Sequence, residues 1–196
     1  MIICKIQGVR KYSFSERRQT DEKVIFVIYC DIYFCKLQKF LRWGGDDFTV
    51  IDAPAEIADR AFSFAKLYEE SETSYDWGAQ DPVRSIKIDC SGLVVMCYKY
   101  ALVDTKYQLL VSDMTSDYIY RNASSRIDKS QLRKGDLIFM GENNKVSHIA
   151  IFEKLENGNI YFIDSTEKDN INGVTRRFYN EDDEKFIAYG IMRIKY

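Results

Sequence analysis

The residues of this 196-residue chain that could do chemistry begin with IKIDCSGLVVMCYKY, residues 86–100, where Asp89, Cys90 and Ser91 precede an apolar run. A thiol in the first turn of a helix lies close to the partial positive charge of the helix N-terminus, which stabilises a thiolate. Most cysteines are instead small buried hydrophobes, and Cys97, inside the apolar run, fits that role. Cys90 does not, because its neighbours are polar and it stands at the start of the run. We therefore expect Cys90 to be a nucleophile.

A nucleophilic thiol needs a base, and His148 is the single histidine of the chain. A lone histidine within a strand is more often a hydrogen-bonded core residue than a catalytic one. Its surroundings favour catalysis, because the stretch VSHIAIFEKL that contains it is followed, after an Asn-Gly pair, by NIYFIDST, which contains Asp164.

A β-hairpin closed on Glu153 and Asn159 by a five-residue loop would bring these two groups together. In that register Ala150 faces Phe162, Phe152 faces Ile160 and His148 faces Asp164. Directly opposite side chains have Cβ atoms ~4.5–5.5 Å apart, so the carboxylate can hold the imidazole. The hairpin therefore predicts Cys90 as nucleophile, His148 as base and Asp164 as the residue that orients the base. This prediction depends on the register, because a slip of one residue would turn Asp164 to the other face.

The composition excludes several classes of protein. Lys and Arg number 28 against 30 Asp and Glu, so the net charge of −2 leaves no basic surplus for binding nucleic acid. The five cysteines, at positions 4, 30, 35, 90 and 97, form no Cys-x-x-Cys pair and no cluster with histidine. We expect no metal or other cofactor, at least one free thiol, and no readable disulfide framework.

Residues 1–50 form an N-terminal segment of unknown role. Its window VIFVIYCDIYFCKL, residues 24–37, is the most hydrophobic of the chain, but Asp31 interrupts it. The window falls short of the ~18 apolar residues of a membrane span, and no small-residue cleavage site follows it. We interpret it as a buried strand pair or helix and expect no stable membrane span. An unusual signal or anchor, or sequence upstream of the functional domain, stays open.

The helices and strands that carry these candidate residues begin near residue 53. The stretch APAEIADRAFSFAKLYEE predicts an amphipathic helix over 53–70 with Pro54 in its first turn. A second, wholly apolar helix is expected over 93–101, with Gly92 in its first turn. Helix and loop fragments fill 102–131. Four runs rich in β-branched and aromatic residues then predict strands over 137–140, 146–155, 159–166 and 189–196. Helices followed by strands make the chain an α+β protein.

Over residues 53–196 these motifs resemble the NlpC-type cell-wall cysteine peptidases, which have a papain-like fold. The resemblance rests on YDWGAQDPVRSIKIDCSGLV, LRKGDLIFM, VSHIAIF and YFIDST, in that order. It implies N-terminal helices packed on a central antiparallel sheet, Cys90 as nucleophile and His148 as base. Asp164 occupies the position of a polar third catalytic residue, which is usually a second histidine in the family.

The resemblance also assigns residues around the thiol. Tyr75 matches a tyrosine near the thiol that helps to stabilise the oxyanion, and Asp89 and Ser91 match positions that contact the substrate. Three features depart from the family pattern. Ala79 replaces the second glycine of a pair, Lys134 stands where proline is common, and residues 1–50 match no wall-binding segment.

The expected function is hydrolysis of peptidoglycan stem peptides, at the bond between D-glutamate and a diamino acid by resemblance. The expected partner is a stem peptide or muropeptide, the expected state a monomer, and the expected location the bacterial envelope or the outside of the cell, with cytoplasmic recycling as the alternative. Two other functions stay open: a papain-like amidase or acyltransferase with a non-wall substrate, and an inactive binding module.

Overall fold

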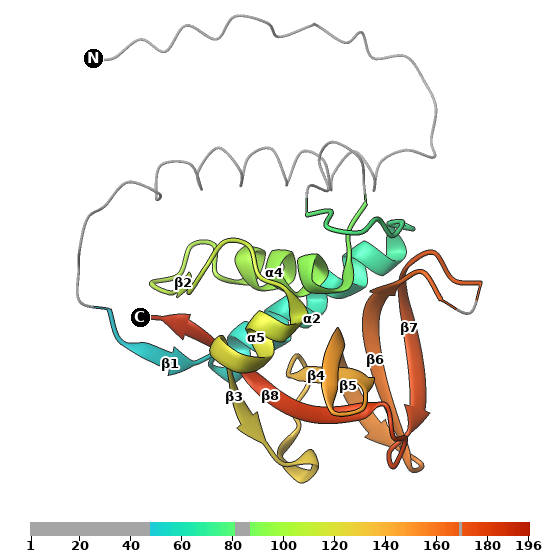
Figure 1. Cartoon of the computed structure of the whole chain (residues 1–196). Coiled ribbons are helices and arrows are strands. Elements are labelled where there is room, and N and C mark those ends of the chain that lie inside the picture. Colours follow the sequence, from blue (N-terminus) through green and yellow to red (C-terminus); the bar gives the residue numbers. More distant parts are fainter. Residues whose placement is uncertain (1–47, 81–86, 169) are drawn as a thin grey trace, which may run out of the picture.

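The structure, a computed structural model, describes residues 48–80, 87–168 and 170–196, and the apolar window 24–37 lies outside them. It has the expected α+β class, with helices packed on an antiparallel sheet (Figure 1). The chain enters the sheet at β1 (Val50–Asp52), which begins before residue 53, where we placed the start of the domain. The described part of the chain contains no helix long and apolar enough to cross a membrane.

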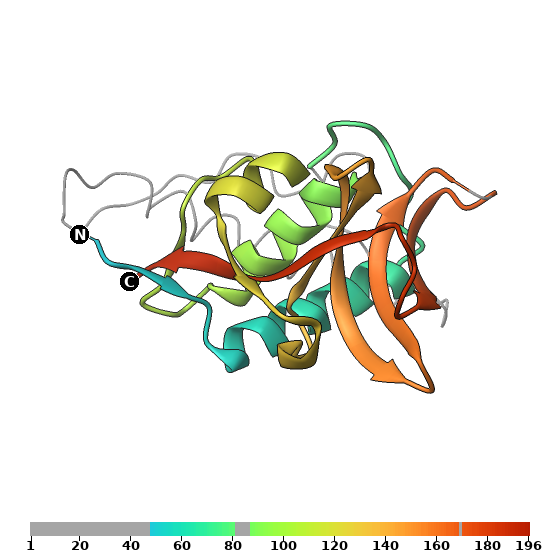
Figure 2. The ribbon, with the colours of Figure 1, turned by 60° about the horizontal axis from the view of Figure 1, so that its bottom comes forward.

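Two helices cover one face of the sheet. Helix α2 (Ala55–Glu70) follows Pro54 as its N-cap, and its buried residues recur at helical spacing. Helix α4 (Cys90–Ala101) is buried along nearly all its length and packs on α2 and on the sheet, as its apolar sequence predicts (Figure 2). A short helix, α5 (Ser116–Asn122), and a 3-10 turn (Lys129–Gln131) connect the helices to the strands.

The sheet runs in the order β1-β8-β4-β5-β6-β7, with β2 and β3 also paired to β8 and every pairing antiparallel. Strands occupy the four runs expected from the sequence, but β1, β2, β3 and β7 were not expected. Two of them, β2 and β3, lie in 102–131, where only helix and loop fragments were expected. The remaining strands are β2 (Gln108–Leu109), β3 (Ser124–Ile127), β4 (Leu137–Glu142), β5 (Lys145–Glu156), β6 (Asn159–Thr166), β7 (Gly173–Asn180) and β8 (Phe186–Lys195).

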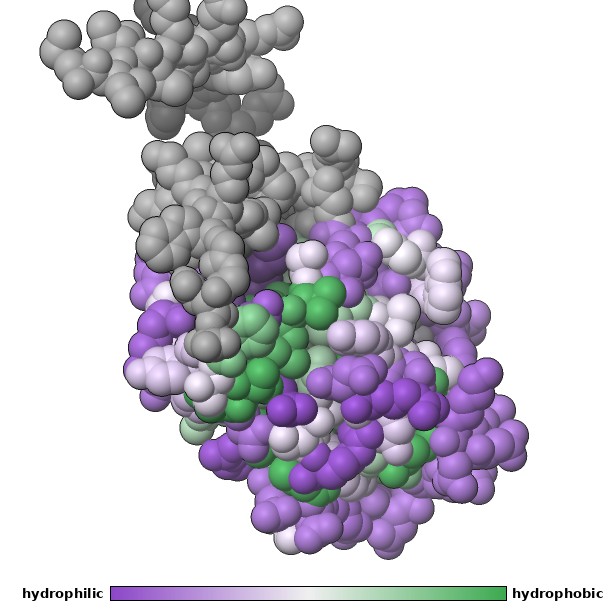
Figure 3. All heavy atoms as spheres, turned by 60° about the vertical axis from the view of Figure 1, so that its left-hand side comes forward, coloured by the Kyte–Doolittle hydropathy of each residue, from purple (hydrophilic) through white to green (hydrophobic). Residues whose placement is uncertain are grey.

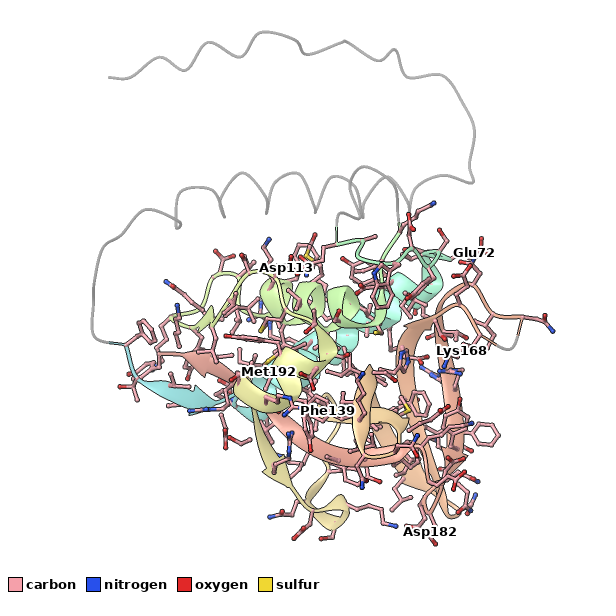
Figure 4. All side chains as sticks on the ribbon, in the orientation of Figure 1. Glu72, Asp113, Phe139, Lys168, Asp182 and Met192 are labelled. Carbon is pink, nitrogen blue, oxygen red and sulfur yellow. The ribbon has the colours of Figure 1, made fainter. Side chains whose placement is uncertain are left out.

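The sheet buries apolar side chains on both faces. Phe139 of β4 and Met192 of β8 belong to the core under the helices and are fully buried, whereas Glu72 and Lys168 are exposed at the periphery (Figure 4). The opposite face carries a second core: Ile138, Met140, Ala150, Phe152, Ile160 and Phe162. On the face shown in Figure 3, hydrophilic side chains surround a larger apolar patch and some smaller ones.

The register expected for the β5–β6 hairpin is wrong. Phe152 pairs with Phe162, not with Ile160, and the loop is the two-residue turn of Asn157 and Gly158. Both turn residues have positive φ, 53° and 72°, as a type I′ turn requires, so the Asn-Gly pair itself pointed to this tighter loop. An irregularity between Phe152 and Lys154 then shifts the register by one residue.

The predicted core role of Cys97 gives a stability test. Cys97 is fully buried in α4, and burial raises the pKa of its thiol. A serine hydroxyl at this position would have no water to bond, and it is smaller than the sulfur that it would replace. Cys97→Ser should lower the free energy of unfolding by about 1–3 kcal/mol in urea titrations. Cys97→Ala is the matched control without a polar atom. Unchanged stability together with lost activity would mean that the roles of the two α4 cysteines are exchanged.

Candidate active site

The N-terminus of α4 is built around the carboxylate of Asp89. Its Oδ1 accepts hydrogen bonds from the backbone N–H of Gly92 at 2.6 Å and from the Ser91 hydroxyl at 3.0 Å, and so caps the helix. Its Oδ2 accepts the backbone N–H of Gly78 at 2.9 Å. Cys90 is therefore the first residue of α4, at the positive end of the helix, with 6% of its surface exposed.

The loop that ends at residue 80 packs directly onto this helix end. A Cβ added to Gly92 would lie 2.6 Å from the backbone oxygen of Ala79, so only glycine lets the loop approach so closely. The backbone N–H of Asp89 also donates to that oxygen, at 3.1 Å. Alanine at position 79, a departure from the family pattern, thus supplies the same backbone contact that a glycine would.

Tyr75 lies in this loop close to the thiol. Burial, followed by the negative charges of Cys90 and Asp89, raises the pKa of Tyr75 to about 12. Its phenol therefore stays protonated at neutral pH and can donate a hydrogen bond. The backbone N–H of Tyr75 donates to Oδ1 of Asn172 at 3.0 Å, which ties the loop to the segment before β7.

His148 and Asp164 meet despite the wrong register. His148 Nε2 lies 2.6 Å from Oδ2 of Asp164, whose side chain is fully buried, while 21% of the His148 side chain is exposed. The true pairing differs from the expected one by two residues at this end of the hairpin. A shift of two keeps the same face, so the two side chains become diagonal neighbours, still within reach of each other.

The charge on His148 follows from its contacts. Burial lowers the pKa of the imidazole, but hydrogen bonds to Asp164 and to Cys90 outweigh burial and raise the pKa to about 9. The imidazole is thus protonated at neutral pH. Because Asp164 occupies Nε2, the other ring nitrogen, Nδ1, is left to face the thiol.

One hydrogen bond joins the strand of the carboxylate to the helix of the thiol. The hydroxyl of Ser165, next to Asp164 in β6, donates to the backbone oxygen of Ile88 at 2.6 Å. Both residues are fully buried. The segment entering α4 is therefore fixed on β6, and Cys90, His148 and Asp164 are held together from three elements.

Sequence reasoning missed Arg177, which contacts the same carboxylate from the unexpected strand β7. Its Nε donates to Oδ1 of Asp164 at 3.0 Å and its Nη2 donates to Oδ2. The alternation of β-branched, aromatic and charged residues in GVTRRFYN, residues 173–180, was a readable sign of a strand. The inward orientation of Arg177 could not be predicted from the sequence, because arginine side chains are mostly exposed.

The six residues singled out from the sequence thus gather around one thiol. The structure brings Tyr75, His148 and Asp164 together with Cys90. Asp89 caps the helix, and the Ser91 hydroxyl donates to Asp89. Within residues 48–80, 87–168 and 170–196, no three His, Cys, Asp or Glu side chains gather as metal ligands.

Among solved structures, the chain is similar to the crystal structure of Ly7917, with a TM-score of 0.47 and 14% identity. The same values hold for Ly7917 with the hydrolyzing product of MDP. In both cases the match covers 69% of this chain and 62% of Ly7917, so the chain spans less than two thirds of that protein. No curated protein matches the sequence.

The model of the NlpC/P60 family matches residues 72–188, which is more than half of the chain. The matched range begins just before Tyr75 and includes Cys90, His148 and Asp164. It agrees with the resemblance of the sequence motifs. The chain belongs to the NlpC/P60 family.

Proposed function

We propose that this protein cleaves the stem peptides of peptidoglycan with a Cys90–His148–Asp164 triad, at the bond between D-glutamate and a diamino acid. The observation that carries the proposal is the position of His148, whose Nε2 lies 2.6 Å from Oδ2 of Asp164 and whose ring also contacts the thiol of Cys90. This arrangement has the logic of nucleophile, base and orienter. The choice of bond rests on the family alone.

In the first step the Cys90 thiolate attacks the carbonyl carbon of the scissile amide. The carbonyl oxygen gains the negative charge, and donors aimed at it lower the barrier. The backbone N–H of Cys90, at the open N-terminus of α4, and the protonated phenol of Tyr75 are the donors that the site offers. Collapse of the intermediate breaks the C–N bond and leaves a thioester on Cys90.

His148 moves the protons in both half-reactions. Its imidazolium protonates the leaving amine in the first, and the resulting neutral imidazole removes a proton from water in the second. The water oxygen attacks the thioester carbonyl, and the Cys90 thiolate leaves as the carboxylic acid forms. Asp164 holds the ring by Nε2 through both steps, so Nδ1 stays directed at the reacting groups.

A substrate in the wall places the protein in the bacterial envelope or outside the cell, and free wall fragments would instead place it in cytoplasmic recycling. Both substrates carry the same peptide bond. Intact peptidoglycan and soluble muropeptides, tested side by side, therefore distinguish the two locations through the preferred form of the substrate.

Cys90→Ala tests the nucleophile. Release of stem-peptide fragments, measured by mass spectrometry, should fall by more than about 100-fold, because the other described thiol, Cys97, is fully buried and cannot reach a substrate. Folding should be intact, since one buried sulfur leaves a small cavity, and circular dichroism checks this. Retention of more than a few per cent of the activity would overturn the mechanism.

Labelling distinguishes an enzyme from the alternatives. Iodoacetamide at pH 6 should alkylate Cys90 before Cys97, because the first thiol contacts an imidazolium and the second is fully buried in an apolar helix. Selective labelling with no release of wall fragments would favour an amidase or acyltransferase with another substrate. Equal, slow labelling of both thiols would favour the inactive binding module.

Asp164→Asn tests the orienter by pH dependence. The aspartate raises the pKa of His148 through its hydrogen bond and its charge, so the imidazolium is lost only as the pH rises through about 9. Removing the charge should lower that pKa. The alkaline limb of kcat/KM, which reports the free enzyme, should therefore move to lower pH, and the maximum should fall at least about tenfold.

The control for this variant is Asp164→Ala, which also removes the hydrogen-bond acceptor and should be slower still. Thermal unfolding must accompany both variants, because each leaves the buried Arg177 without its counter-charge. Identical pH profiles and rates for the wild type and the Asn variant would show that another residue orients His148.

A further inference from the structure

We infer that Arg177 is a positioning residue of this site, which holds the Asp164 carboxylate in the plane and direction that His148 needs. The inference rests on the proposed triad. Arg177 engages both oxygens of the carboxylate, Oδ1 through Nε and Oδ2 through Nη2. A planar guanidinium that binds a carboxylate through two parallel N–H groups fixes its orientation as a single donor cannot.

The burial of the carboxylate gives this contact its importance. The side chain of Asp164 is fully buried and that of Arg177 is 12% exposed. A charge withdrawn from water is costly unless it is paired and hydrogen-bonded. His148 supplies one hydrogen bond to one oxygen, and Arg177 supplies a bond to each of the two oxygens.

Arg177 is itself fixed in place. Its Nη1 donates to the hydroxyl of Tyr179 at 2.9 Å, and its guanidinium lies 5.5 Å from the ring centroids of Tyr179 and of Phe162. Phe162 pairs directly with Arg177 across β6 and β7, and Asp164 pairs with Thr175. The arginine therefore reaches the carboxylate diagonally across the two strands, from a backbone held by a continuous ladder.

Arg177 and His148 share one oxygen of the Asp164 carboxylate, which couples the two contacts. Oδ2 accepts from both Arg177 and His148, so a rotation of the carboxylate that lengthened one bond would disturb the other. The neighbouring arginine does not have this position. Arg176, the preceding residue, faces the opposite side of β7 and pairs with Glu153 at 3.1 Å.

Arg177→Gln and Arg176→Gln are therefore a matched pair, with the same change on adjacent residues of one strand. Because the chain has a single histidine, an imidazole N–H signal in the spectrum of protein labelled with ¹⁵N-histidine belongs to His148. The wild type should show the downfield proton of Nε2–H bonded to Asp164. The signal should stay in Arg176→Gln, and it should be lost or move upfield in Arg177→Gln.

Kinetics then show whether Arg177 acts through Asp164. In the wild-type background, Arg177→Gln should lower kcat/KM at least about tenfold, mainly through kcat. In the Asp164→Asn background, the same substitution should lower kcat/KM by less than about twofold. Arg177→Lys keeps the cation but not the two-pronged geometry, so its rate should lie between those of the wild type and Arg177→Gln. This variant also serves if Arg177→Gln does not fold.

An unchanged Nε2–H signal and an unchanged kcat/KM in folded Arg177→Gln or Arg177→Lys would overturn the inference. Equal losses in the wild-type and Asp164→Asn backgrounds would also overturn it, because Arg177 would then act on stability alone. The spectra need no substrate. A wild type that cleaves no wall fragment would therefore contradict the proposed function and leave the test of Arg177 intact.

Discussion

The arrangement of the site depends on one carboxylate that is wholly removed from water. Asp164 must be compensated where it lies, and it is compensated from two directions, by His148 of β5 and Arg177 of β7. These contacts fix which nitrogen of His148 is occupied and keep the ring protonated at neutral pH. The negative charge of Asp164 thereby stabilises the positive charge of His148, next to the thiol.

The two halves of the fold meet at this carboxylate. The sheet supplies the proposed base and its orienter, and the buried helix α4 supplies the proposed nucleophile. Ser165, the neighbour of Asp164, is hydrogen-bonded to Ile88, just before the helix begins. Asp89 then caps the helix and binds the backbone of the preceding loop, which carries Tyr75. The polar residues that surround Cys90 in the sequence are thus mainly those that hold the thiol at a fixed helix end.

Much of this site could be predicted from residue types and spacing. A cysteine between polar residues at the start of an apolar run, and a single histidine near an aspartate, were sufficient to single out Cys90, His148 and Asp164. The hairpin register was wrong, but its error of two residues at that end kept His148 and Asp164 on one face. Arg177 could not be predicted, because its role depends on a buried ion pair across strands, and nothing local in 173–180 distinguishes the inward arginine from Arg176.

We propose that His148 carries a positive charge between the thiol of Cys90 and the carboxylate of Asp164, and the NMR titration of the single imidazole tests this most directly. The C2 proton of His148 can be followed from pH 5 to 11 without assignment ambiguity. The account predicts a pKa of about 9, from hydrogen bonds that outweigh burial. A pKa at or below the ordinary histidine value of 6.5 would show that the imidazole is neutral at working pH, and would contradict the account.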